Sequence, residues 1–151
     1  MLKQSIEQDL KTALLAGDKT RTNVLRSIKS AITYKEVELG VKGGVGLTEE
    51  EIVDTLIRES KKRQESADIF ANNNQQLRAD QELQEKIIID HYLPAVISEE
   101  DLTVLVNRYV GEIENLSLKD TGQIISKVRQ EGKGRVDSAV VARLVKERLQ
   151  G

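Results

Sequence analysis

The chain has 151 residues, of which 38% are hydrophobic, 32% are charged and 3% are aromatic, and its formal net charge is −2. It has no cysteine and a single histidine, which excludes a disulfide framework, a thiolate metal centre and a zinc site built from histidines. The apolar run of about 18 residues that a membrane span requires is absent, and so is the apolar core of a secretory signal. We therefore expect a cytoplasmic protein with no membrane role.

The first 40 residues predict two helices joined by a tight turn. The apolar residues of the first helix recur every four positions on one face, and they are Leu2, Ile6, Leu10 and Leu14. Gly17 suits the left-handed conformation that ends a helix, and Asp18 suits the start of the next one. The second helix should stop near Gly40, where the glycine-rich stretch GVKGGVG predicts a loop.

Two start signals precede the third predicted helix. Thr48 and Glu51 have the spacing of a capping box. Leu47 and Ile52 have the spacing of a hydrophobic staple. The middle of this helix, RESKKRQES, has no apolar residue, and we expect it to form an exposed face of ion pairs.

A cluster of asparagines, ANNNQQ, predicts a break before the fourth helix. That helix should end before Leu93, because Pro94 lacks an N–H group and disfavours helical geometry in the residue before it. We therefore expect an N-terminal domain of about four helices over residues 1–95. A second domain is expected over residues 96–151.

The second domain is predicted to be a small bundle of three helices. Ser98 and Asp101 have capping spacing at the start of the first helix, and Ser117 and Asp120 precede the second. Asp137 is expected to cap the third. No segment alternates with a period of two, so no strand is expected and the predicted fold class is all-α.

The stretch EGKGRVDS separates the last two predicted helices. Gly132 and Gly134 would form a turn there, followed by Asp137 as a helix cap. A phosphate cradle on the helix amides is disfavoured, because the carboxylate of Asp137 would occupy the same N–H groups and repel an anion. The glycines of this stretch therefore predict a structural turn that presents basic side chains.

Basic residues are concentrated near the C-terminus. Residues 127–148 contain seven basic and three acidic residues, a local excess of four positive charges. Two interpretations remain open: a solvated helical face, or a shallow basic surface for the phosphates of a nucleic acid. No nucleophile with an adjacent base is recognisable, so no catalytic residue, metal or other cofactor is expected. Under the second interpretation, the residues that would contact the nucleic acid, here RNA, are Lys127, Arg129, Lys133, Gly134, Arg135, Arg143 and Lys146.

Several stretches resemble, in this order, the GatB/YqeY family: DLKTALLAGDKTRTNVLRSIKSAI, LTEEEIVDTLIRESKKRQESADIF, YLP followed by SEEDL, DTGQIISKVRQEGKGRVD, and LVKERL. The ordered set spans nearly the whole chain. The resemblance implies an all-helical protein whose C-terminal domain is similar to the tail of the GatB subunit of the tRNA-dependent amidotransferase, which helps to hold misacylated tRNA. It carries over Asp120, Gly122, Lys133, Gly134, Arg135 and Asp137, whereas Val136 and Ser138 replace residues that are often Ala and Gly in relatives.

The resemblance implies a tRNA-binding or amidotransferase-related accessory protein. The family's label is a carbon–nitrogen ligase activity with glutamine as amido donor, but the chain has no room for the amidotransferase's catalytic domain. We therefore expect no enzyme activity from this chain alone, with tRNA and a protein of amide transfer or translation as partners. The alternative is a helical protein–protein adaptor without an RNA role, docking for example through the middle of the third helix.

Overall fold

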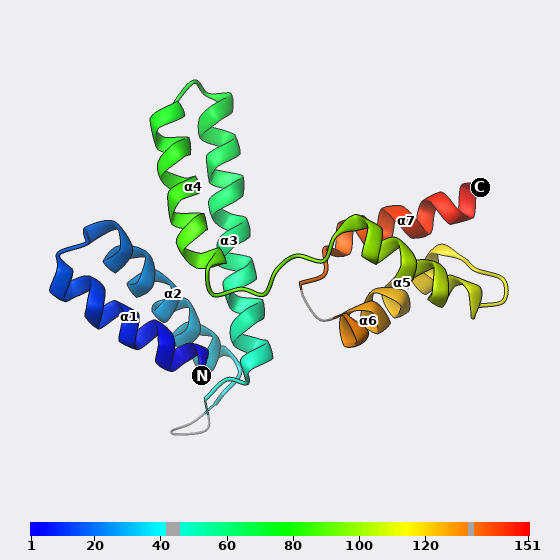
Figure 1. Cartoon of the computed structure of the whole chain (residues 1–151), viewed down its shortest axis with the longest axis horizontal. Helices are drawn as coiled ribbons and strands as arrows, with labels where there is room; N and C mark the ends of the chain where they lie inside the picture. The colour runs from blue at the N-terminus through cyan, green and yellow to red at the C-terminus, as the bar shows by residue number, and fades with distance from the viewer. Residues whose placement is uncertain (42–45, 133–134) are drawn as a thin grey trace. The chain divides into compact units, whose positions relative to one another are not determined.

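The computed structural model describes residues 1–41, 46–132 and 135–151. Within these ranges the chain forms seven α-helices and one 3-10 helix, and no strand, so the predicted all-α fold class is confirmed (Figure 1). The helices are α1 (Leu2–Ala16), α2 (Lys19–Glu38), α3 (Glu49–Asn72), α4 (Gln76–Asp90), α5 (Glu99–Gly111), η1 (Leu118–Asp120), α6 (Thr121–Glu131) and α7 (Ser138–Gln150). They divide into two compact units, Met1–Leu93 and Pro94–Gly151. None of the described helices is long and apolar enough to cross a membrane.

Local capping chemistry sets the helix ends of the first unit. Gly17 ends α1 with a φ of 70°, and the Asp18 side chain accepts a hydrogen bond from the Arg21 N–H at 3.1 Å. Thr48 and Glu51 make both hydrogen bonds of the predicted capping box at the start of α3. These ends were predicted because each depends on residues within one turn of the boundary.

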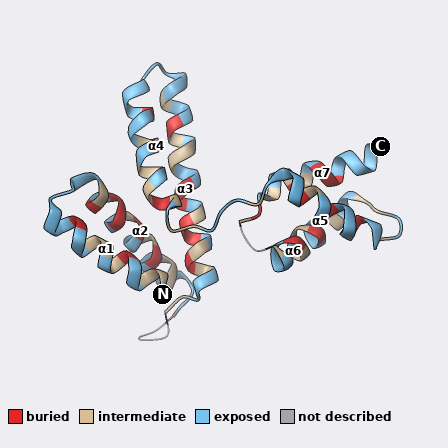
Figure 2. Cartoon of the chain, viewed as in Figure 1, coloured by how far each residue is buried: buried red, intermediate tan, exposed pale blue. Residues whose placement is uncertain are grey.

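The core of the first unit is aliphatic and lies between α1, α2, the first half of α3 and the end of α4 (Figure 2). Its buried residues are Ile6, Ala13, Val24, Leu25, Ile28, Ile32, Ile52, Leu56 and Ile89. Leu2 and Leu10 pack against this cluster, as the period of the first helix predicts. Leu14 is exposed, and it lies in the last turn of α1, beside the turn at Gly17 that joins α1 to α2.

Beyond this core, α3 and α4 continue together as an antiparallel hairpin (Figure 1). The fully buried residues of its outer part are small, Ala67 and Ala79. Two large apolar residues of α4, Leu77 and Ile87, are 87% and 68% exposed. A two-helix hairpin has one interface only, so most of its apolar positions cannot be covered.

The second unit packs α5, α6 and α7 around its own aliphatic core, as predicted. The buried residues are Leu102, Val106, Val110, Ile124, Val128, Val136, Val141, Leu144 and Val145. The Ser117–Asp120 capping box belongs to η1 rather than to α6, which begins directly after it at Thr121.

Candidate functional site

Backbone hydrogen bonds fix Arg135, one of the predicted RNA contacts, beside the segment that precedes α5. Its N–H donates to the Ala95 carbonyl and its carbonyl accepts from the Ile97 N–H, both at 2.9 Å. These bonds form an isolated parallel bridge between Arg135 and Val96. The adjoining predicted contacts, Lys133 and Gly134, lie outside the described residues.

Gly132 ends α6, as predicted, but for a different physical reason. Its backbone is extended, with a φ of −67°, so no left-handed conformation requires a glycine there. A Cβ atom at this position would lie 2.6 Å from Cδ1 of Ile97 and 2.9 Å from the carbonyl oxygen of Val128. Glycine is therefore needed for space, because the segment before α5 packs directly onto the end of α6.

The two basic residues of α6 lie on different sides of the helix. Lys127 and Arg129 are two positions apart, which on an α-helix separates them by about 160° around the axis. The Lys127 ammonium lies 5.6 Å from the centre of the Tyr109 ring on α5. Arg129 is exposed and makes no hydrogen bond or ion pair with a described residue. The structure does not bring these two predicted contacts together.

Glu131 neutralises positive charge at the end of α6. Its carboxylate accepts hydrogen bonds from the Arg108 guanidinium and the Tyr109 hydroxyl, both on α5. The bond from Tyr109 is the main cause that lowers the pKa of Glu131, and the same bond raises the pKa of Tyr109. Sequence reasoning missed this cluster, since its members on α5 and α6 lie more than 20 residues apart.

The basic residues of α7 are exposed, as predicted, but they differ in their partners. Arg143 donates to Glu147 on its own helix at 2.9 Å and to Glu99 at the start of α5 at 2.5 Å. The hydrogen bond to Glu99 is the main cause that raises the pKa of Arg143. Lys146 has no hydrogen bond or ion pair within the described part of the chain. Of these two predicted contacts, only Lys146 presents an uncompensated charge.

The second unit as a whole carries no net charge. Residues 94–151 contain nine basic and nine acidic residues. The excess of positive charge over residues 127–148 is balanced by carboxylates on α5, η1 and the segment between them. Its field at a distance is therefore weaker than the local count suggests, and contacts with an anion depend on individual side chains.

The structure shows the role of three residues that the family resemblance singled out. Asp120 accepts a hydrogen bond from the Ser117 N–H at 2.9 Å, and Asp137 caps α7 by accepting one from Ala139 at 3.0 Å. Both carboxylates therefore stabilise helix starts. No atom would lie within 4 Å of a Cβ added to Gly122, so this glycine is not required by packing.

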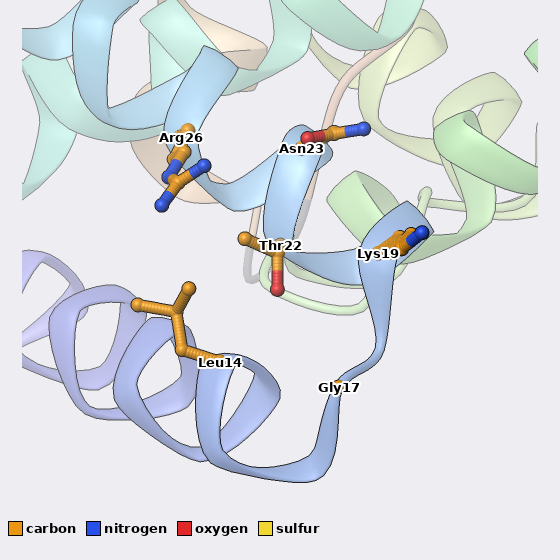
Figure 3. A pocket seen from close by; sticks show the side chains of 6 residues that line it. All are labelled: Leu14, Gly17, Lys19, Thr22, Asn23 and Arg26. Carbon is orange, nitrogen blue, oxygen red and sulfur yellow. The ribbon is translucent and has the colours of Figure 1, made fainter.

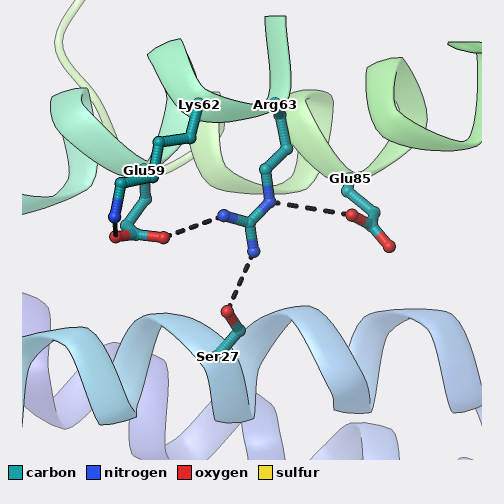
Figure 4. Close-up of polar contacts among 5 residues, drawn as sticks. All are labelled: Ser27, Glu59, Lys62, Arg63 and Glu85. Atoms are coloured by element: carbon teal, nitrogen blue, oxygen red, sulfur yellow. Dashed lines mark hydrogen bonds and ion pairs between the residues drawn. The ribbon is translucent and has the colours of Figure 1, made fainter. Parts of the chain in front are cut away.

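The middle of α3 matches the expected exposed face of ion pairs only in part. The exposed side carries Arg58, Lys61, Lys62 and Glu65. The opposite side of the helix is buried by polar contacts with α2 and α4 (Figure 4). Glu59 and Ser60 are buried, and the side chain of Arg63 is only 14% exposed. The Arg63 guanidinium donates to Glu59 at 2.8 Å and to the Ser27 hydroxyl of α2 at 2.9 Å, and it lies 3.6 Å from Glu85 of α4. Arg63 thus joins three helices, and one side of the middle of α3 is taken up by contacts within the first unit.

A sequence signal for this burial was present. Positions 52, 56, 59, 60, 63 and 67 follow the helical spacing of one face, on which the apolar residues Ile52 and Leu56 are replaced farther along by polar ones. A prediction based on hydrophobicity alone assigns such polar residues to the surface. Their mutual hydrogen bonds are what make burial possible.

Within the described ranges no group of three or more His, Asp or Glu side chains is placed to hold a metal ion. His91 follows the last residue of α4 and is exposed. The second unit presents exposed cations, Arg129 and Lys146 among them.

Comparison with known proteins assigns most of the chain to the family that its sequence motifs resemble. A family model described as Yqey-like protein matches residues 3–149. Two curated relatives share the name Altered inheritance of mitochondria protein 41, mitochondrial. The one from Eremothecium gossypii is 30% identical over 112 residues, which cover 73% of this chain and 60% of the relative. The one from Lachancea thermotolerans is 30% identical over 122 residues, covering 77% and 64%. The chain therefore spans less than two thirds of the length of either relative.

Proposed function

Because the chain belongs to the Yqey-like protein family, we propose that its second unit binds RNA, with tRNA as the favoured class. The likeness of DTGQIISKVRQEGKGRVD to the amidotransferase tail supports this function. The structural observation that carries it is that Arg129 and Lys146 are exposed without a partner among the described residues. Such cations are available for phosphate oxygens, whereas paired ones are not.

The proposed mode of binding is contact with the RNA backbone, without readout of bases. The ring of Tyr109 already lies near two cations, at 5.4 Å from Arg108 and 5.6 Å from Lys127, so it is not a free platform for base stacking. With about three or four phosphate contacts, log K should fall against log salt with a slope of about −2 to −4. Binding is therefore weak and sensitive to salt.

A titration of labelled tRNA with the full chain tests this proposal. Affinity should fall at least about tenfold between about 50 and 200 mM salt. The double variant Arg129→Gln, Lys146→Gln should bind more weakly and with a shallower salt slope. The matched control is Lys11→Gln with Arg58→Gln, which removes two exposed cations of the first unit that also lack described partners. Equal affinity of all three proteins, or no binding at low salt, removes the RNA function.

An accessory role in amide transfer, and the cytoplasmic location expected from the sequence, are parts of the same proposal. The first is tested by following glutamine-dependent amidation of Glu-tRNA with and without this chain beside the amidotransferase subunits. A rate that is unchanged over a range of chain concentrations contradicts it. The location is tested by fractionating cells and detecting the native protein.

A second candidate function is docking on another protein. The observation that favours it is an exposed apolar pair on the last turns of α2, where Tyr34 and Val37 are 76% and 74% exposed. They are three positions apart and therefore share one face of the helix. Capture of a protein by the full chain, lost in the variant Tyr34→Ser, Val37→Ser while tRNA affinity is unchanged, would favour the adaptor.

A further inference from the structure

A small pocket opens between the end of α1 and the start of α2, in the first unit (Figure 3). Its volume is about 250 Å³. The residues that line it are Leu14, Gly17, Lys19, Thr22, Asn23 and Arg26. It is separate from the RNA contacts proposed above, which all belong to the second unit.

Thr22 lines this pocket, and its hydroxyl has no protein partner among the described residues. The residue is 6% exposed, and its side chain makes no hydrogen bond with any described residue. Figure 3 shows its oxygen directed into the space between the two helices. Four helical threonines elsewhere bond the carbonyl four residues earlier, as Thr12 does to Gln8 at 3.1 Å and Thr55 to Glu51 at 2.8 Å. No buried side-chain oxygen or nitrogen of the described residues lacks a partner, so the Thr22 hydroxyl is open to solvent from the pocket and is free to bond a ligand there.

The same face of α2 supplies positive charge. Lys19 and Arg26 lie three positions before and four positions after Thr22, a spacing that puts all three side chains on one side of the helix. Arg26 extends from α2 toward Leu14 on α1 (Figure 3). Neither cation has a hydrogen bond or ion pair with a described residue. The pocket thus combines an apolar wall with two uncompensated cations and a hydroxyl.

We propose that this pocket binds a phosphate group, held by the guanidinium of Arg26 and the hydroxyl of Thr22, with Lys19 as a second positive charge. A guanidinium binds phosphate oxygens through two parallel hydrogen bonds, and a hydroxyl donates one more. Two cations match a phosphate, which carries between one and two negative charges near neutral pH, better than they match a carboxylate. The amides at the start of α2 take no part, because Asp18 already accepts from the Arg21 N–H.

Thermal unfolding of the full chain in inorganic phosphate, at constant ionic strength and pH 7, provides the test. The Tm should rise with phosphate concentration, because a ligand that binds only the folded state stabilises it. Acetate should give no rise. Adenosine monophosphate distinguishes the source of the group: stronger binding than inorganic phosphate indicates a phosphomonoester, and weaker binding indicates the free anion.

Three variants make the result specific. Arg26→Gln should abolish the phosphate response, and Thr22→Val should weaken affinity about tenfold, the effect of losing one hydrogen bond to a charged group. Without phosphate, Thr22→Val should keep the wild-type Tm, because no internal hydrogen bond is lost. Arg58→Gln removes an exposed cation of α3 and should respond as the wild type does. The proposal is overturned if phosphate raises no Tm, if acetate acts equally, or if Arg26→Gln responds like Arg58→Gln.

Discussion

The guanidinium of Arg63 donates a hydrogen bond to the carboxylate of Glu59 at 2.8 Å, on a face of α3 that contacts both α2 and α4. The two side chains are 14% and 11% exposed. The pair lies beyond the last large apolar residue of this face, Leu56, and takes the place of aliphatic contacts there. Polar side chains thus hold three helices together where the hydrophobic core of the first unit ends (Figure 4).

Replacing Arg63 by Ala should destabilise the first unit by up to about 3 kcal/mol, because Glu59 would remain buried with the Lys62 ammonium, at 3.1 Å, as its remaining described partner. Urea denaturation followed by circular dichroism measures this change. Arg58→Ala is the matched control, since Arg58 is exposed on the same helix, and it should change stability by less than about 0.5 kcal/mol. Similar unfolding midpoints for the two variants would show that the network contributes little.

Glu85 should make stability depend on pH. Burial and, secondly, the nearby charge of Glu82 raise the pKa of Glu85 above 4.5, while Arg63 opposes the shift. The folded protein therefore binds this proton more tightly than the unfolded chain does, which stabilises the fold below pH 4.5 and ceases to do so as the pH rises through the raised pKa.

The variant Glu85→Gln, which resembles the protonated side chain, should accordingly be more stable than the wild type at pH 7. This difference should shrink as the pH falls below 4.5. Glu65→Gln, an exposed change on α3, serves as the control in the same unfolding series. A constant difference between Glu85→Gln and the wild type across this range would contradict the assignment.

Gly132→Ala should destabilise the second unit by about 1 to 3 kcal/mol, because the new methyl group would overlap Ile97 and the Val128 carbonyl. Gly122→Ala is the natural comparison, because it adds the same methyl group to α6 in open space. Alanine favours helix formation, so this second variant should be neutral or more stable by up to about 1 kcal/mol. The measurement is the Tm of each variant in thermal unfolding. Equal Tm values for the two variants would mean that the packing around Gly132 relaxes without loss of stability.

Releasing Arg143 from its carboxylates should strengthen RNA binding, if the second unit has that function. The variant Glu99→Gln, Glu147→Gln removes both partners and leaves the guanidinium free for phosphate. One additional phosphate contact should steepen the slope of log K against log salt by about 0.7 to 0.9. The control adds Arg143→Gln to the same background, which removes the contact and lowers the overall charge by one. If the control binds RNA as tightly as the double variant, Arg143 is not part of the interface.

Several features of the fold were predictable because their causes are local. The Thr48–Glu51 capping box, the turn at Gly17 and the end of α4 before Pro94 each depend on residues within a few positions of one another. The all-α class follows from the same local patterns and from the scarcity of aromatic residues.

The tertiary structure decided which charged residues are paired and which are not. Arg143 has the same exposed position on α7 that its spacing predicts, but its partner Glu99 lies 44 residues away. Likewise the burial of Glu59 depends on Arg63 reaching Ser27 of α2, 36 residues earlier. Helical periodicity determines which face a side chain occupies, whereas its charge compensation depends on what the fold brings against that face. The sequence by itself therefore determined the helices and their ends, and the packing of distant helices decided which cations remain free to bind an anion.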